Sequence, residues 1–430
     1  MVQKKYWDPE IETMSSDALR KLQLSRLQDV VSRAYEKSNL YRQRFDAAGV
    51  KPTDINRLDD IKKLPLLEDT EFRATPLQDR LTVPISQIPV ICSSGGTTGI
   101  PSPLPRTQRD WENNCIARQA RARWTAGFRP GDIAQERTNY ECTGAANKLI
   151  GVQRLTLCAG RGFLDNQIRL AQLLGVTIIV DVPSFALRYL DRARELGIDI
   201  KQTKIRAIWP GSETWVESYK KRLETRYGVT FLPGFYGASD TGGIEANECE
   251  YYNGYHIFAD HVLFEIIDPE TGDVLEDGQE GELVVTTLTL EALPLIRWRA
   301  GDITSIFPYE PCPCGRTLPK MARVRGRIAQ SALVKGKRIF PIDVEEVIFT
   351  TPGLGEEYQV IVDAPGEQDR LKVKAEYAPE VTNLKGVKEQ VEEALTQALG
   401  VPTEVELVPG RSLEHAFFKA QRIITTYPKS

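Results

Sequence analysis

Ser93-Ser94-Gly95-Gly96-Thr97-Thr98-Gly99 is the most informative stretch of the chain, because it contains only Gly, Ser and Thr and follows the apolar run Ile88–Cys92. Glycine lets the backbone turn sharply and bring its N–H groups close to a ligand, and the hydroxyl groups add neutral donors. The loop therefore predicts a polyphosphate site. It does not follow the Walker pattern, since no Lys comes after the last Gly. An ordinary surface turn is the alternative interpretation.

The composition is that of a large globular chain. Its 430 residues are 41% hydrophobic and 27% charged, which suggests two or more domains. A net charge of −4 argues against a nucleic-acid or anionic membrane surface. No apolar run approaches the roughly 20 residues that span a bilayer, and the first residues lack the apolar core of a signal peptide. With seven cysteines, an odd number, we expect a protein of the reducing cytoplasm.

Periodicity predicts an α/β fold. Residues 16–36 have helical spacing, with Ser16 as the expected cap. From about residue 86, short β-branched runs such as Thr177–Val180 alternate with helical patterns, which favours largely parallel strands. Turn signals between residues 257 and 290 indicate β-hairpins.

A domain boundary is expected near Arg327. Beyond it, apolar and polar residues alternate over Leu371–Tyr377, and helical spacing over Val387–Ala398 stops at Gly400. We therefore expect a large domain over residues 1–327 and a small α+β domain over residues 328–430.

Further segments complete a pattern that resembles adenylate-forming enzymes, most closely the phenylacetate–CoA ligase family. The opening Tyr6–Met14 and the segment Thr287–Ile296 look like signatures of that family. The other motifs occur in the family's order and at its approximate separations, so the resemblance runs nearly end to end; they are Gly211-Ser212-Glu213, Phe235–Asp240, Ile296–Asp302, Val324–Arg327, Lys335–Pro341 and Phe418–Arg422.

The resemblance implies an ATP-dependent acid–CoA ligase that forms AMP. A carboxylate is a poor acceptor for a thiol because its leaving group would be oxide, and conversion to an acyl-adenylate supplies a good leaving group. The family's fold implies an N-terminal adenylation domain with mixed sheets and helices and a mobile C-terminal lid. ATP, Mg²⁺ and CoA are the implied cofactors, and a homodimer is one possible assembly.

The resemblance also assigns nucleotide contacts. The Ser93–Gly99 loop would hold the β- and γ-phosphates, Tyr236 would stack on the adenine, and Asp302 would accept hydrogen bonds from both ribose hydroxyls. Asp240 stands where the family usually has Glu and would help to hold Mg²⁺. The remaining implied ATP or AMP contacts are Gly211, Ser212, Glu213, Gly237, Ala238, Ser239, Arg323 and Arg327.

Lys419 is the implied catalytic residue of the adenylation step, because it precedes an Ala-x-Arg as the family's lysine does. A flexible ammonium can reach both the substrate carboxylate and the α-phosphate. Lys335 and Gly336 would line the CoA channel after the domains rotate. The chain departs from the family in its additional Gly at 95 or 96, at Ala329 of the hinge and at Phe418.

The residues that would line the acyl pocket are Tyr140, Trp209, Gly211 and Gly237. Packing in the core explains the two aromatic residues equally well. An aromatic pocket suits an aryl acid. Because residues 139–166 differ from phenylacetate-type members, a substituted benzoate or a short branched or hydroxylated acid is also considered.

We expect a tetrahedral structural zinc site, because one His and three thiols make a full set of zinc ligands: Cys249, His256, Cys312 and Cys314. Their spacing is not that of a common zinc finger, and reduced thiols beside a hydrogen-bonded His are the alternative. Cys92, Cys115, Cys142 and Cys158 are interpreted as buried thiols.

Two other functions stay open at this point. The acyl group could pass to the phosphopantetheine of a carrier protein, which ends in the same thiol arm as CoA. Alternatively, the departures from the family pattern could mark a nucleotide-binding sensor that has lost turnover.

Overall fold

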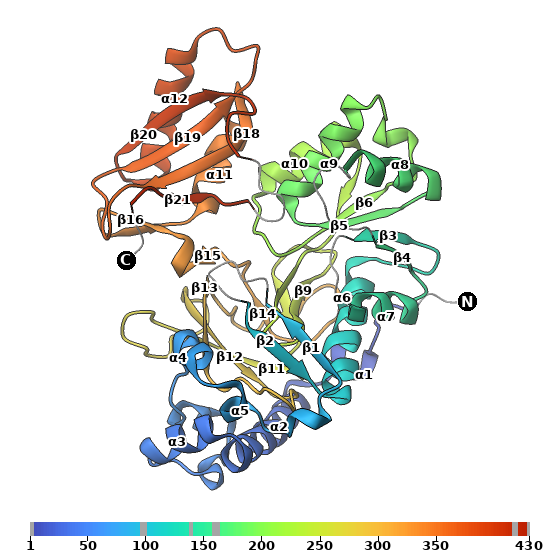
Figure 1. The fold of residues 1–430 in the computed structure, drawn as a ribbon, viewed down its shortest axis with the longest axis vertical. Coiled ribbons are helices and arrows are strands. Elements are labelled where there is room, and N and C mark those ends of the chain that lie inside the picture. The colour runs from blue at the N-terminus through green and yellow to red at the C-terminus, as the bar shows by residue number, and fades with distance from the viewer. Residues whose placement is uncertain (1–3, 95–100, 137–140, 157–163, 415–419, 428–430) are drawn as a thin grey trace. The chain divides into compact units, whose positions relative to one another are not determined.

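The computed structural model describes residues 4–94, 101–136, 141–156, 164–414 and 420–427, and Figure 1 shows the fold. The chain divides into two compact units, each described by itself below. Unit 1 contains residues 1–134, 138–156 and 232–323, and unit 2 contains residues 135–137, 157–231 and 324–430. The domain boundary expected near Arg327 stays a prediction.

Unit 1 begins with helices, drawn in blue in Figure 1. They are α1 (Pro9–Glu12), α2 (Ser16–Lys37), α3 (Asn39–Ala47), α4 (Asp69–Ala74) and α5 (Leu77–Arg80). The predicted helix over residues 16–36 is confirmed as α2, with Leu19, Leu27 and Val30 on its buried face. Its cap is Ser15 rather than Ser16, since the Ser15 side chain accepts the N–H of Ala18.

The sheets of unit 1 are antiparallel. Strands β1 (Val90–Ser93) and β2 (Pro103–Arg106) pair with each other. A second sheet has the order β14 (Lys320–Met321), β10 (Tyr255–Ile257), β9 (Gly243–Glu248) and β8 (Phe235–Ala238). In a third, β11 (Val262–Ile267) pairs with β12 (Gly281–Thr287), and β12 pairs with β13 (Trp298–Thr304). The hairpins predicted between residues 257 and 290 are confirmed.

Further helices and short strands complete the first part of the chain. A π-helical turn, η4 (Asp110–Ile116), continues directly into α6 (Ala117–Ala126), which packs against β9. This part also contains α7 (Glu141–Leu149), β3 (Ile133–Glu136), β4 (Gln153–Thr156) and the 3₁₀-helices η1 (Pro52–Asp54), η2 (Leu58–Lys63) and η3 (Ile85–Gln87).

Unit 2 contains the predicted parallel strands. Strand β6 (Ala207–Pro210) pairs in parallel with β5 (Ile178–Asp181) and with β7 (Thr230–Phe231). Helices α8 (Leu164–Leu174), α9 (Pro183–Glu195) and α10 (Glu217–Tyr227) alternate with these strands along the chain. The alternation predicted from the sequence is therefore confirmed for this part of the chain.

The C-terminal part of unit 2 is the expected α+β arrangement. Its sheet has the order β20 (Thr403–Pro409), β19 (Leu371–Tyr377), β18 (Leu354–Val362) and β21 (Ile423–Thr425). Helices α11 (Pro341–Thr350) and α12 (Leu384–Leu399) accompany it, and α12 ends at Gly400, whose φ of 64° is left-handed. The remaining elements are β15 (Gly326–Arg327), β16 (Ala332–Val334) and β17 (Lys337–Ile339).

Among the residues that the structure describes, no helix is both long and apolar enough to cross a membrane.

Candidate functional site

Tyr236 on β8 and Asp302 on β13 meet although 66 residues separate them. The Tyr236 hydroxyl donates a hydrogen bond of 2.8 Å to Oδ2 of Asp302, and the Tyr236 ring contacts Phe264 edge-on with ring centroids 6.3 Å apart. Asp302 is only 5% exposed and follows Gly301, whose φ of 73° favours glycine. The structure thus brings together the two residues to which the sequence assigned the adenine and the ribose.

The end of β8 and the turn that follows it are held by contacts with several other segments. A Cβ added at Gly237 would lie 2.5 Å from the carbonyl oxygen of Gly243, so only glycine fits there. The Ala238 N–H donates to Glu245 at 2.9 Å. One guanidinium nitrogen of Arg106 donates to the carbonyl oxygens of Ser239 and Asp240, at 2.7 and 3.0 Å.

Glu245 lies on β9 and contacts the end of β8 through Ala238, and the sequence reasoning missed it. It is fully buried, it lies 3.6 Å from the Arg118 guanidinium, and burial raises its pKa to about 8. Arg106, which the sequence reasoning also missed, is buried on β2. No motif marks either residue, since each acts through a contact with a distant part of the chain.

Asp240 forms an ion pair with Arg73 of α4. Oδ1 of Asp240 lies 3.3 Å from Nη2 of Arg73, and Nε of the same guanidinium lies 2.8 Å from Oδ2 of Asp69. The carboxylate that the sequence assigned to Mg²⁺ therefore has a cationic partner of its own chain. Arg73 was not predicted to take part in the site.

The Gly211-Ser212-Glu213 segment follows β6 in unit 2. Ser212 has a φ of 64°, an uncommon value for a residue other than glycine. Glu213 accepts hydrogen bonds from the backbone and the hydroxyl of Ser184 and from the backbone N–H of Ala420. Burial raises the pKa of Glu213. Trp209, on β6, is 1% exposed, which favours its core-packing interpretation over a role in the acyl pocket.

Other predicted residues lie at defined places in their own unit. Arg323 donates to Glu248 at 2.9 Å in unit 1, and Arg327 lies on β15 in unit 2. Lys335 and Gly336, in the turn between β16 and β17, both have positive φ. Ser93 ends β1, and the Ser94 N–H donates to the carbonyl oxygen of Ser102 at 3.0 Å. Seven predicted site residues lie outside the described residues: Gly95, Gly96, Thr97, Thr98, Gly99, Tyr140 and Lys419.

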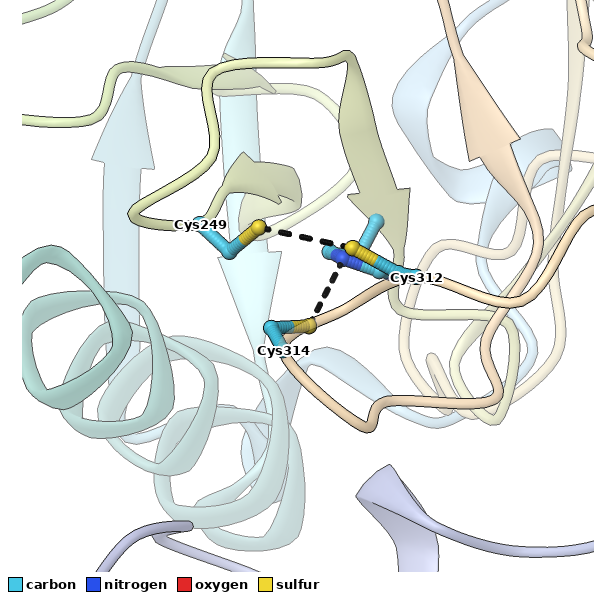
Figure 2. Close-up of side chains that lie close together, drawn as sticks. Cys249, Cys312 and Cys314 are labelled. Carbon is cyan, nitrogen blue, oxygen red and sulfur yellow. Dashed lines mark hydrogen bonds between the residues drawn. The ribbon is translucent and has the colours of Figure 1, made fainter.

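The predicted cysteine and histidine cluster is brought together in unit 1. Cys249 follows β9, His256 lies on β10, and Cys312 and Cys314 precede β14, all of them buried. Their ligand atoms lie within 4.8 Å of one another. The sulfur atoms of Cys249 and Cys312 are 3.7 Å apart, and the Cys314 sulfur is 3.4 Å from Nε2 of His256. Figure 2 shows the three labelled cysteines with their sulfur atoms directed toward a common point.

These distances suit a tetrahedral metal site. Zinc–sulfur bonds of about 2.3 Å place two sulfur atoms of a tetrahedron about 3.8 Å apart, close to the separation of Cys249 and Cys312. Among the other cysteines, Cys115 and Cys142 are buried as predicted. Cys92 is only half-buried, because its strand β1 pairs with a single neighbour, and Cys158 lies outside the described residues.

Comparison with known proteins identifies the family. The sequence model of the AMP-binding enzymes matches residues 2–290, and that of the AMP-binding enzyme C-terminal domain matches residues 336–426. Phenylacetate-coenzyme A ligase of Aromatoleum evansii is 35% identical, over 97% of either chain. The Escherichia coli K12 phenylacetate-coenzyme A ligase is also 35% identical, over 97% of this chain and 96% of its own.

A solved structure shares the fold. 2-Hydroxyisobutyryl-CoA ligase, in the postadenylation state in complex with 2-HIB-AMP, superposes with a TM-score of 0.90 and 24% sequence identity, covering 99% of this chain and 93% of its own. This likeness bears on the architecture, and the full-length sequence matches bear on the family. The chain thus belongs to the phenylacetate–CoA ligase family of adenylate-forming enzymes and is an AMP-forming acid–CoA ligase.

Proposed function

We propose that the enzyme activates a small carboxylic acid, either an aryl acid or a short branched or hydroxylated acid, and transfers it to free CoA. The observation that carries the proposal is the full-length match at 35% identity to ligases named for phenylacetate. The likeness to a ligase named for 2-hydroxyisobutyrate bears on architecture alone, so the short hydroxylated acids come from the sequence differences at residues 139–166. We place the enzyme in the cytoplasm and keep the homodimer as its proposed assembly.

Pyrophosphate release in the presence of ATP, Mg²⁺ and a panel of acids tests this proposal. The panel contains phenylacetate, substituted benzoates and 2-hydroxyisobutyrate, each with and without CoA. We expect acid-dependent pyrophosphate release, with a thioester and AMP as products when CoA is present. Thioester formation only on a carrier-protein phosphopantetheine would favour the carrier alternative. Absence of turnover with every acid would favour the sensor alternative.

The proposed nucleotide site is built around Asp302. Its carboxylate is acceptor-only and is oriented by the Tyr236 hydroxyl, so it suits a pair of ribose hydroxyls. The turn at residues 237–240, fixed by Gly237 and Arg106, would present backbone groups to AMP. Gly211, Ser212, Arg323 and Arg327 stay in the proposed set on the strength of the family motifs.

Asp302→Ala should weaken the binding of ATP because it removes a charged acceptor. Hydrogen bonds to charged groups contribute about 1.5–3 kcal/mol each, so we expect the dissociation constant to rise by about tenfold or more. Isothermal titration calorimetry with ATP measures this change. Asp273→Ala, at an exposed carboxylate of unit 1, is the matched control. An unchanged affinity in Asp302→Ala would remove this residue from the site.

Asp240 is the proposed protein ligand of Mg²⁺. Its donor type fits, since Mg²⁺ is usually held by one or two carboxylates together with substrate phosphates and water. When bound, the ion would neutralise phosphate charge during adenylation. The ion pair between Asp240 and Arg73 would have to open for this role.

Lys419 is the proposed catalytic residue of the first half-reaction. Lys419→Ala should reduce acyl-adenylate formation by about 10²–10³-fold, the usual effect of losing an electrostatic group of this kind. Thioester formation from supplied acyl-adenylate and CoA should continue, because the lid would then present Lys335 and Gly336 instead. Rapid-quench measurement of each half-reaction distinguishes the two effects. Lys385→Ala, at an exposed lysine of α12, is the control. Equal loss of both half-reactions would contradict the two-step use of the lid.

A structural zinc ion is proposed at Cys249, His256, Cys312 and Cys314. The donors are the preferred zinc ligands, and four protein ligands would leave no open position for catalysis. The ion would tie the turn after β9 to the segment before β14 and stabilise the fold.

Purified protein should contain about one zinc per chain by elemental analysis, on the four-ligand geometry expected of structural sites. Cys312→Ala should lose the metal and unfold at a lower temperature, because binding energy at such a site is folding energy. The half-buried Cys92 lies outside the cluster, so Cys92→Ala should keep its zinc. A zinc content well below one-half in wild-type protein would contradict the proposal.

A further inference from the structure

Both carboxylate oxygens of Glu213 are engaged within unit 2. Oε2 accepts the N–H of Ser184 at 3.1 Å, and Oε1 accepts the Ser184 hydroxyl at 3.0 Å. Oε1 also accepts the backbone N–H of Ala420 at 2.7 Å, the shortest of the three bonds. Ser184 lies in the first turn of α9, where N–H groups lack partners within the helix and favour negative charge. Glu213 thus joins the segment after β6 to the start of α9 and to Ala420.

The chain beyond Ala420 is held a second time, at Arg422. The Arg422 guanidinium pairs with Glu357 and lies over the Tyr358 ring, 4.4 Å from its centroid. The Arg422 carbonyl oxygen accepts the N–H of Val360 at 2.7 Å, where β21 begins its parallel pairing with β18. Strand pairing therefore fixes the chain from Arg422 onward, and Glu213 fixes it two residues earlier.

The N–H that Glu213 accepts belongs to the peptide bond between Lys419 and Ala420. The other residue of that peptide bond is Lys419, which we propose as the catalytic residue of adenylation. A carboxylate that accepts this N–H restrains the backbone of Ala420, the residue that follows Lys419 in the sequence. Both carboxylate oxygens of Glu213 accept hydrogen bonds in these contacts. The contacts therefore give the side chain a structural role that does not require it to bind adenine.

We propose that Glu213 is a positioning residue, which holds the Lys419–Ala420 peptide group in the arrangement that forms the acyl-adenylate. The proposal rests on the role proposed for Lys419 and gives Glu213 a different task from the adenine contact that the family motif implies. Misplacement of a catalytic group by about 1 Å can reduce a rate by about 10²-fold. Loss of the Glu213 contact should therefore slow adenylation and spare the second half-reaction.

Glu213→Ala and Glu213→Gln test the proposal. Glu213→Ala should slow acyl-adenylate formation by about 10–100-fold, and thioester formation from supplied acyl-adenylate and CoA should stay within about threefold of wild type. Glu213→Gln keeps one acceptor oxygen and should fall between wild type and Glu213→Ala. Ser184→Ala keeps the bond to Ala420 and should have a smaller effect. Glu217→Gln, at an exposed carboxylate of α10, is the matched control and should behave as wild type.

Limited digestion with trypsin supplies a readout that does not depend on activity, because trypsin cleaves after Lys419. Mass spectrometry should show faster cleavage of the Lys419–Ala420 bond in Glu213→Ala. Cleavage after the exposed Arg411 in the same digest should be unchanged and serves as an internal control.

Three results would overturn the proposal. Equal losses in both half-reactions, with equal acceleration at Lys419 and Arg411, would give Glu213 a purely structural role. A weaker affinity for ATP with unchanged cleavage after Lys419 would support the adenine contact instead. Normal adenylation by Glu213→Ala despite faster cleavage would show that the contact does not serve catalysis. The Lys419→Ala variant separates the two proposals. Normal adenylation by Lys419→Ala would contradict the catalytic role of Lys419, whereas normal adenylation by Glu213→Ala alone would contradict only the positioning role of Glu213.

Discussion

The requirement that a buried charge must find a partner determines how unit 1 is assembled. Arg316 pairs with Glu12 at 2.7 Å, and Arg121 forms two bonds to Asp260 at 2.8 and 3.0 Å. Removal of one member of a buried pair usually costs about 3–5 kcal/mol, because the other charge is left without compensation. These pairs hold the N-terminal segment to the loop before β14, and α6 to the turn between β10 and β11.

The same requirement shapes the candidate site. Asp302 receives the Tyr236 hydroxyl, Asp240 receives the Arg73 guanidinium, and Glu213 receives two backbone N–H groups and a hydroxyl. Adenylation is mainly a matter of position and of charge neutralisation. Hydrogen-bond donors that fix the orientation of a carboxylate before a ligand binds reduce the rearrangement that binding requires.

Much of the local structure could be predicted from periodicity. The helix α2, the strand β5, the hairpin of β11 and β12, and the helix that ends at Gly400 all occur where their patterns indicated. Local spacing fails where a cap or an exposure depends on neighbours, as at Ser15 and at Cys92. The clustering of Cys249 and His256 with Cys312 and Cys314 was predicted from residue type, and the fold brings their ligand atoms together.

The sequence by itself determined the alternation of strands and helices, the family and the identities of the residues in its motifs, because these are written in local order and spacing. Only the tertiary structure decided which donor meets each carboxylate. Arg73 lies 167 positions from Asp240, and Ala420 lies 207 positions from Glu213. Contacts of this kind arise when packed elements bring distant segments together, and neither periodicity nor composition carries that information.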